Sequence, residues 1–179
     1  MYNLLLNLTK EYDTLIHRPS IDVINNHFKG RDIRGAEIGV SFGKHAKMLL
    51  KGVPNLRKLY LVDPFFNYEG IDSTWDMFVM REKAHQRLDG FDSKHFIEKT
   101  SADAAKLFHR NELDFCYIDG NHNYEFVKQD IELWYPVVNE GGLLMGHDFQ
   151  DPEVARAVLD QFPFCVHTRG YPVTWWIEK

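Results

Sequence analysis

The stretch that decides the fold is "LDFCYIDGNHNYEFVKQDIELWYPVVNEGGLLMGHD", residues 113–148. It opens with an apolar run, residues 113–120, which predicts a buried strand. Residues 124–138 follow, and their apolar side chains recur at the spacing of one helix face. A second apolar run, residues 141–148, begins at two glycines and predicts another strand. This strand–helix–strand order indicates parallel strands of one sheet that are joined by a helix.

The same alternation extends through the rest of the chain. We expect further strands at 35–40, 58–63 and 94–100, and a final pair at 164–169 and 173–178. We expect helices at 20–28, 43–50, 73–90, 101–110 and 152–162, with Ser20 and Ser101 as N-caps and Gly90 as a stop. The pattern predicts an α/β fold with a doubly wound, mostly parallel sheet. In such folds ligands bind at the carboxyl ends of the strands.

Length and composition narrow the class of protein. The chain has 179 residues and a formal net charge of -5, which fits one globular domain over 1–179, with a helical N-terminal segment at 1–34. The acidic balance argues against a general nucleic-acid or membrane binder, and no apolar run reaches the length of a membrane span. No signal peptide is recognisable. We expect Cys116 and Cys165 to be buried free thiols in a reducing, cytoplasmic setting.

Small and acidic residues follow the first two strands. Glu37, Gly39, Ser41 and Gly43 form an E-x-G-x-x-x-G pattern, which differs from the dinucleotide fingerprint G-x-G-x-x-G. Gly39 suits a tight turn, and Gly43 opens a helix whose amides favour anionic groups. Asp63 comes 24 residues after Gly39, where a carboxylate can accept hydrogen bonds from ribose hydroxyls. An ordinary strand–helix turn with a loop-capping Asp remains the alternative.

The later strand ends carry titratable side chains. Asp119 and His122 follow the fourth predicted strand, and His147 and Asp148 follow the fifth. If these strands are neighbours, Asp119, His147 and Asp148 converge and can bind a divalent cation. His122 can then act as a general base. The alternative is a set of loop-capping Asp side chains and two ordinary His. After the third strand, Ser101 caps a helix, and the turn with Ala102 can also touch an adenine ring.

Three segments together resemble the class I S-adenosylmethionine-dependent methyltransferases. They are "AEIGVSFG" (36–43), "LYLVDPF" (59–65) and "CYIDGNHNYEFVKQDIELWYPVVNEGGLLMGHDF" (116–149). The resemblance covers roughly residues 35–150. It is strongest to the branch with macrocin-type sugar O-methyltransferases and cephalosporin-hydroxylase-like proteins, through its Asp-Gly-x-His-x-Tyr element. It implies a seven-stranded sheet with the last strand antiparallel.

The resemblance also implies roles for individual residues. The backbone at Gly39 and Ser41 would hold the methionine end of the cofactor, with Glu37 behind it, and Asp63 would bind the ribose. Asp119 would face the sulfonium and, with Asp148, hold a metal such as Mg²⁺ or Mn²⁺, while His122 would be the base. His147 departs from the family, which usually has an acid there. This change favours a different ion or no metal at all.

The leading hypothesis is an O-methyltransferase acting on a small hydroxylated acceptor, such as a sugar, with or without a metal. A non-catalytic module that binds the cofactor or a nucleotide is one alternative, and an NAD-dependent oxidoreductase is another. The aromatic insertion 65–75 is expected either to cover the cofactor or to be plain loop. Trp175 and Trp176 lie in the last predicted strand, where they can serve the core or the interface of a homo-oligomer.

Overall fold

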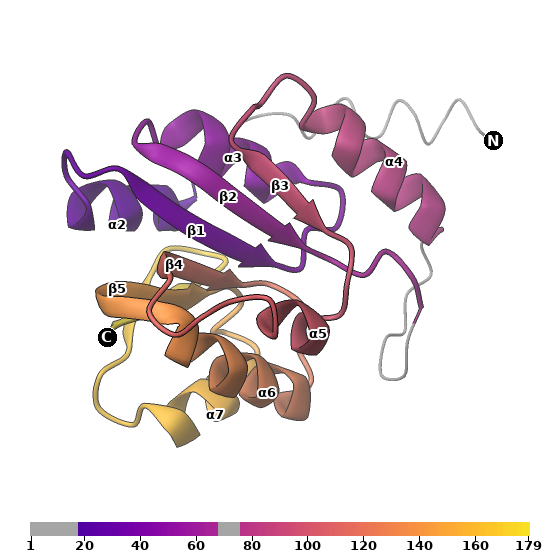
Figure 1. Ribbon diagram of the computed structural model, residues 1–179. Coiled ribbons are helices and arrows are strands. Elements are labelled where there is room, and N and C mark those ends of the chain that lie inside the picture. The colour runs from indigo at the N-terminus through magenta and orange to yellow at the C-terminus, as the bar shows by residue number, and fades with distance from the viewer. Residues whose placement is uncertain (1–17, 68–75) are drawn as a thin grey trace.

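A computed structural model describes residues 18–67 and 76–179, which form one seven-stranded sheet between two layers of helices (Figure 1). The strands are β1 (Ile33–Ile38), β2 (Leu56–Val62), β3 (Lys94–Ile97), β4 (Leu113–Ile118), β5 (Val138–Gly146), β6 (His167–Arg169) and β7 (Thr174–Glu178). Their order in the sheet is β3-β2-β1-β4-β5-β7-β6. Strands β1 to β5 pair in parallel, and β7 runs antiparallel to both β5 and β6. The predicted fold class is confirmed.

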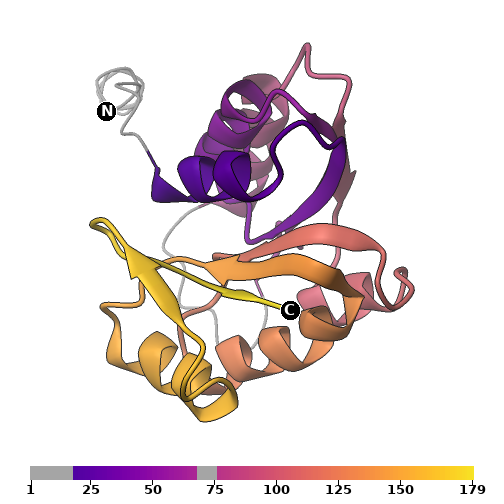
Figure 2. The same ribbon diagram turned by 90° about the vertical axis from the view of Figure 1, so that its left-hand side faces the viewer.

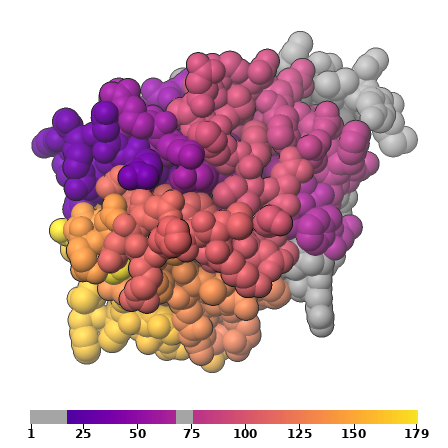
Figure 3. Space-filling model, in the orientation of Figure 1, coloured from indigo at the N-terminus to yellow at the C-terminus, as the bar shows by residue number. Residues whose placement is uncertain are grey.

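The helices divide between the two faces of the sheet. They are α2 (Pro19–His27), α3 (Lys44–Gly52), α4 (Met77–Arg87), α5 (Ser101–Ala105), α6 (Tyr124–Trp134) and α7 (Pro152–Gln161), and a 3₁₀ turn spans Tyr135–Val137. Helices α2, α3 and α4 lie on one face, and α5, α6 and α7 lie on the other (Figures 1 and 2). The space-filling view shows the N-terminal half, indigo to magenta, directly against the C-terminal half, orange to yellow (Figure 3).

The alternation of side chains along each strand builds two cores. In β4, Phe115 and Tyr117 pack with α2, α3 and α4, whereas Cys116 and Ile118 pack with the helices of the opposite face. Successive side chains of a strand point to opposite faces, so a strand in the middle of a doubly wound sheet must be apolar at every position. This is why residues 115–118 form an unbroken buried run.

Two predicted helix caps are wrong. Arg18 and Pro19 come before Ser20 at the start of α2, so Ser20 lies inside the helix and its hydroxyl pairs with His45. Thr100, in an extended conformation, caps α5 by accepting from the Asp103 amide at 3.2 Å. An N-cap residue must lie just outside the helical backbone, and in both helices the chain turns one or two residues earlier than expected.

Other differences lie near the edges of elements. Cys116 is buried as expected, but Cys165 is exposed because only His167–Arg169 of the predicted strand 164–169 pairs with β7, at the edge of the sheet. The predicted helix 101–110 ends at Ala105. The expected helical structure before residue 18, the first residues of the predicted helix 73–90 and most of the insertion 65–75 lie outside the described residues.

The two tryptophans of β7 belong to the core rather than to an exposed face. Trp175 is fully buried, and Trp176 is half-buried against the opposite cluster, where its ring stacks on His167. Within 18–67 and 76–179, no helix has both the length and the apolar character needed to cross a membrane.

Candidate active site

A cavity of about 650 Å³ opens at the carboxyl ends of β1 to β4. Its lining includes these residues predicted from the sequence: Gly39, Ser41, Asp63, Ser101, Ala102, Asp119 and His122. The sheet brings them together because four parallel strands end at the same edge. Four other predicted site residues do not line this cavity: Glu37, Gly43, His147 and Asp148.

The backbone directly after β1 has a conformation and a close neighbour that only a glycine, Gly39, can accommodate. Its φ is +90°, and a Cβ atom there would lie 2.2 Å from the backbone oxygen of Asp119. The turn after β1 therefore passes directly against the turn after β4, which places Asp119 at the cavity wall. Gly43 has a different function. It precedes α3 in a left-handed conformation and packs closely on Ala84 of α4 and on Leu88, the C-cap of that helix.

Asp63 fastens the loop between β1 and α3, residues 39–43, to the end of β2; we call this segment the glycine loop. Its Oδ2 accepts hydrogen bonds from the amides of Val40 and Ser41, at 3.0 and 2.9 Å, and its Oδ1 accepts from the amide of Phe65 at 2.9 Å. Burial raises the pKa of Asp63, and these three amides oppose that shift. A carboxylate has about four acceptor positions, so one remains for a further donor such as a ribose hydroxyl.

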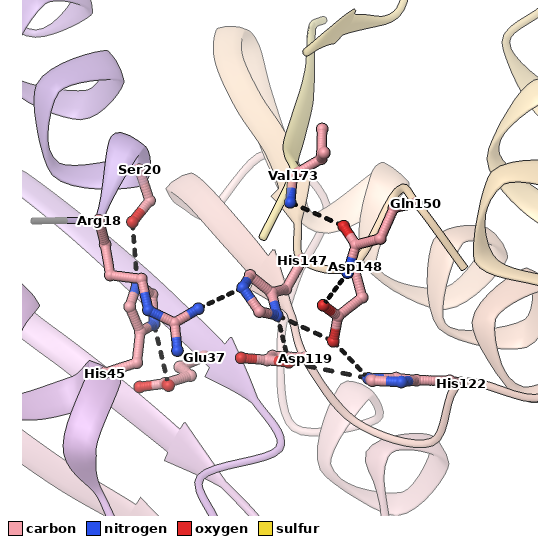
Figure 4. A network of polar contacts seen from close by, with 10 residues as sticks. All are labelled: Arg18, Ser20, Glu37, His45, Asp119, His122, His147, Asp148, Gln150 and Val173. Carbon is pink, nitrogen blue, oxygen red and sulfur yellow. Dashed lines mark hydrogen bonds and ion pairs between the residues drawn. The ribbon is translucent and has the colours of Figure 1, made fainter. Parts of the chain in front are cut away.

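Glu37 begins a buried series of hydrogen bonds that the sequence did not predict. Its Oε1 pairs with His45 Nδ1 at 3.1 Å, and His45 Nε2 lies 2.9 Å from the Ser20 hydroxyl (Figure 4). Burial raises the pKa of Glu37. Its second oxygen, Oε2, is buried without a hydrogen-bond partner in the described chain. These hydrogen bonds connect α2 and α3 to β1 behind the glycine loop.

Four titratable side chains meet where β4 and β5 end (Figure 4). His122 Nε2 lies 3.9 Å from Asp119 Oδ1 and 3.4 Å from Asp148 Oδ2. His147 Nδ1 lies 2.9 Å from Asp148 Oδ2 and 3.6 Å from Asp119 Oδ1. The strands are neighbours, as the convergence of these residues requires.

Arg18 determines which ring nitrogen of His147 donates a hydrogen bond and which accepts one. Its guanidinium contacts His147 Nε2, so this nitrogen accepts while Nδ1–H donates to Asp148. Burial lowers the pKa of His147, which agrees with a neutral ring. Both ring nitrogens therefore have partners. The atoms that can share one cation belong instead to Asp119, His122 and Asp148, and they lie within 4.8 Å of one another.

The electrostatics of this group depend on its mixed charges. The Asp119 carboxylate raises the pKa of His122, and Asp148 adds to that effect. Burial would raise the pKa of Asp119, but His122 and His147 outweigh it, and the pKa lies below its usual value. An ionised carboxylate and a half-exposed imidazole therefore stand side by side at the edge of the cavity.

Asp148 is held in an uncommon backbone conformation. Its φ is +53°, which costs a non-glycine residue about 1 kcal/mol or more. Gln150 donates to Asp148 Oδ1 at 2.6 Å and accepts from the Val173 amide at 2.7 Å (Figure 4). Two carboxylates and an imidazole fixed in this way are ligand types that suit a divalent cation.

The family is shown by sequence. Residues 36–149 match the family model described as "Methyltransferase domain". The chain is also 28% identical over 152 residues to the uncharacterized protein R132 of Acanthamoeba polyphaga mimivirus, which covers 80% of this chain and 65% of that protein. The chain thus spans slightly less than two thirds of the length of this curated relative.

Solved structures share the fold. A putative caffeoyl-CoA O-methyltransferase from Staphylococcus aureus matches with a TM-score of 0.66 at 14% identity, over 99% of this chain and 91% of that one. CalS11, a TDP-rhamnose 3'-O-methyltransferase, matches at 0.62 and 16%, over 89% and 77%. The MycE methyltransferase in complex with Mg, SAH and mycinamycin VI matches at 0.56 and 16%, over 88% and 48%. With the glycine loop, the strand-end acids and the sheet order, the family match leads to one conclusion: this chain belongs to the class I S-adenosylmethionine-dependent methyltransferase domains.

Proposed function

We propose that the protein transfers the methyl group of S-adenosylmethionine to a hydroxyl of a small polyhydroxylated acceptor, such as a sugar. The observation that carries this proposal is the convergence of Asp119, His122 and Asp148 beside the cavity that the glycine loop and Asp63 line. The name of CalS11, which describes a sugar O-methyltransferase with the same fold, supports this acceptor class.

The cavity walls indicate how the methyl donor would lie. The turn at Gly39 and Ser41 would take the methionine end, with Glu37 behind it, and Asp63 would accept from the ribose hydroxyls. Ser101 and Ala102 would lie against the adenine ring. Asp119 would then face the positively charged sulfur, where a carboxylate of lowered pKa is favourable.

The acceptor hydroxyl is a poor nucleophile until its proton leaves. In the proposed step the acceptor oxygen forms a bond to the methyl carbon while the bond from that carbon to sulfur breaks, and the sulfonium becomes a neutral thioether. His122 in its deprotonated form accepts the hydroxyl proton, and the carboxylates that raise its pKa favour this transfer. Holding oxygen, carbon and sulfur in line supplies a large part of the rate.

Asp119 and Asp148 would hold a divalent cation, Mg²⁺ or Mn²⁺, and His122 would remain free for the proton. A bound cation supplies Lewis-acid chemistry that lowers the pKa of a hydroxyl. The presence of Mg in the MycE complex supports this choice. His147, although predicted as a ligand, would serve by orienting Asp148, because Arg18 occupies its other nitrogen.

Titration calorimetry and an acceptor screen test the proposal. S-adenosylmethionine should bind and NAD should not; the reverse result would favour the oxidoreductase. A panel of sugars, nucleotide sugars and catechols should give methylated product, with less product in EDTA and recovery on adding Mg²⁺ or Mn²⁺. Cofactor binding without turnover on any acceptor would favour the non-catalytic module. Full turnover in EDTA would remove the metal from the proposal.

Three expectations about the setting belong to the same proposal. We expect a cytoplasmic protein that acts on small molecules rather than on nucleic acid, and that associates with itself. Light scattering after size exclusion tests the association, because it measures the molar mass in solution directly.

A further inference from the structure

Asp130 is a carboxyl group in the cavity wall that the proposed mechanism does not use. It lies in α6, is 5% exposed, and lines the cavity together with Ser101 and Gly120. A carboxyl group in such a position normally has a cation or several donors beside it. Its single hydrogen-bond partner within the described residues is the hydroxyl of Ser101.

The contact with Ser101 fixes how this carboxyl is oriented. Trp134 Nε1 donates to the Ser101 hydroxyl oxygen at 2.8 Å, so the Ser101 proton is directed to Asp130 Oδ1. Asp130 Oδ2 is left without a hydrogen-bond partner among the described residues. It stands against Gly120, where a Cβ atom would lie 3.6 Å from it. One acceptor atom is thus held rigidly and kept available.

The place of Asp130 in the cavity points to the base of the methyl donor. This argument rests on the proposed function, in which Asp63 binds the ribose. Thr100, Ser101 and Ala102 line the part of the wall after β3, and the apolar side chains of Ile38 and Phe126 line the same cavity. A flat ring with a hydrogen-bonding edge suits such a wall.

We propose that Asp130 Oδ2 accepts a hydrogen bond from the 6-amino group of adenine and makes the cavity selective for 6-aminopurines over 6-oxopurines. A 6-oxo group would place a second acceptor against the carboxylate, and neither oxygen could be satisfied. A site built to pair with an N–H group rejects the analogue that lacks it, since a buried polar group is left unpaired. Burial raises the pKa of Asp130 to about 7, so at pH 8.5 the group is ionised and accepts only.

The test compares S-adenosylhomocysteine with S-inosylhomocysteine by titration calorimetry at pH 8.5. The wild-type protein should prefer the adenine compound by about tenfold or more, the factor that one buried hydrogen bond gives. Asp130→Asn keeps the size of the side chain but presents an N–H group. The affinity of this variant for the adenine compound should fall by about tenfold, and the ratio of its affinities for the two compounds should approach one. Glu132→Gln, the same change at an exposed position of α6, should leave both affinities unchanged.

Each outcome decides one question. An unaltered preference in Asp130→Asn would overturn the inference and leave the methyltransferase proposal standing. Equal affinity of the wild-type protein for both compounds would do the same, even if the variant did not fold. No binding of S-adenosylhomocysteine would overturn both.

Discussion

At the scale of single residues, the site depends on side chains that hold other side chains. Asp63 uses both oxygens on the backbone around it before any ribose arrives. His147 stands between Asp148 and Arg18, the residue before α2, so both of its ring nitrogens have partners. A carboxylate in the place of His147 could only accept, whereas the imidazole both accepts from Arg18 and donates to Asp148.

Replacing Asp63 by Ala should weaken binding of S-adenosylhomocysteine by at least about tenfold. The variant loses a ribose acceptor, and three loop amides lose their partner, so the unfolding free energy should also fall by about 1–3 kcal/mol. Calorimetry and urea denaturation measure the two effects. Asp92→Ala, an exposed carboxylate in the turn before β3, is the control. Unchanged affinity would exclude Asp63 from the cofactor site.

Replacing His122 by Ala should lower kcat by about 100-fold or more while the affinity for S-adenosylhomocysteine stays nearly constant. The Mg²⁺ concentration that gives half-maximal activity separates two roles. It should stay constant if His122 is the base, and it should rise if His122 is a metal ligand. His85→Ala, which removes a partly exposed imidazole from the far end of α4, is the control. Wild-type turnover would remove His122 from the mechanism.

Arg18→Met should lower kcat without changing the affinity for S-adenosylhomocysteine, because His147 loses the donor that fixes its tautomer and orientation. Arg18→Lys should recover part of the loss, since an ammonium group can also donate to Nε2. A purely structural role would instead lower the unfolding free energy and leave kcat intact. Steady-state kinetics and thermal denaturation distinguish these results.

At the scale of elements, the site is made where the turns after β1 and β4 touch. Gly39 allows the two turns to approach closely, and Asp119 lies at the contact. The dipeptide Gly141–Gly142 lies within β5, which ends at Gly146, directly before His147 and Asp148. Parallel neighbours β1, β4 and β5 thus deliver the loop for the cofactor and the acids for the chemistry at one edge.

Gly39→Ala should abolish cofactor binding and lower the unfolding free energy by more than about 2 kcal/mol, because both a positive φ and a 2.2 Å approach to Asp119 would have to be relieved. Gly141→Ala is the matched control. It has a φ of +71° but nothing within 4 Å of its Cβ, so it should cost only the conformational penalty of about 1 kcal/mol. Equal losses in the two variants would contradict the close-contact argument.

At the scale of the whole molecule, the sequence predicts the order of elements better than the connections between distant ones. The apolar period of 113–148 and the glycines at strand ends are local signals, and they place Gly39, Asp63, Asp119 and Asp148 correctly at one edge of the sheet. The pairs Ser20–His45 and Arg18–His147 leave no local signal, since 25 and 129 residues separate their members. In the sequence, Asp130 cannot be distinguished from other polar helix residues, because its burial and its contact with Ser101 arise only when α6 packs onto α5 and the sheet.

The stability of the whole molecule should depend on pH through Asp130. Its pKa is about 7 in the folded protein and about 4 in an unfolded chain, so between these values the folded state binds a proton that the unfolded state does not. The unfolding free energy must therefore fall as pH rises from about 4 to 7, by an amount on the order of 4 kcal/mol.

The side chain in Asp130→Asn does not titrate. Between pH 5 and pH 8 the wild type should therefore lose unfolding free energy that the variant keeps. Urea denaturation at four pH values measures it. The other titrating groups of the site are present in both proteins and cancel in the difference. Glu132→Gln should give a curve parallel to the wild type. A parallel curve for Asp130→Asn would show that the carboxyl is as well solvated in the fold as in the unfolded chain.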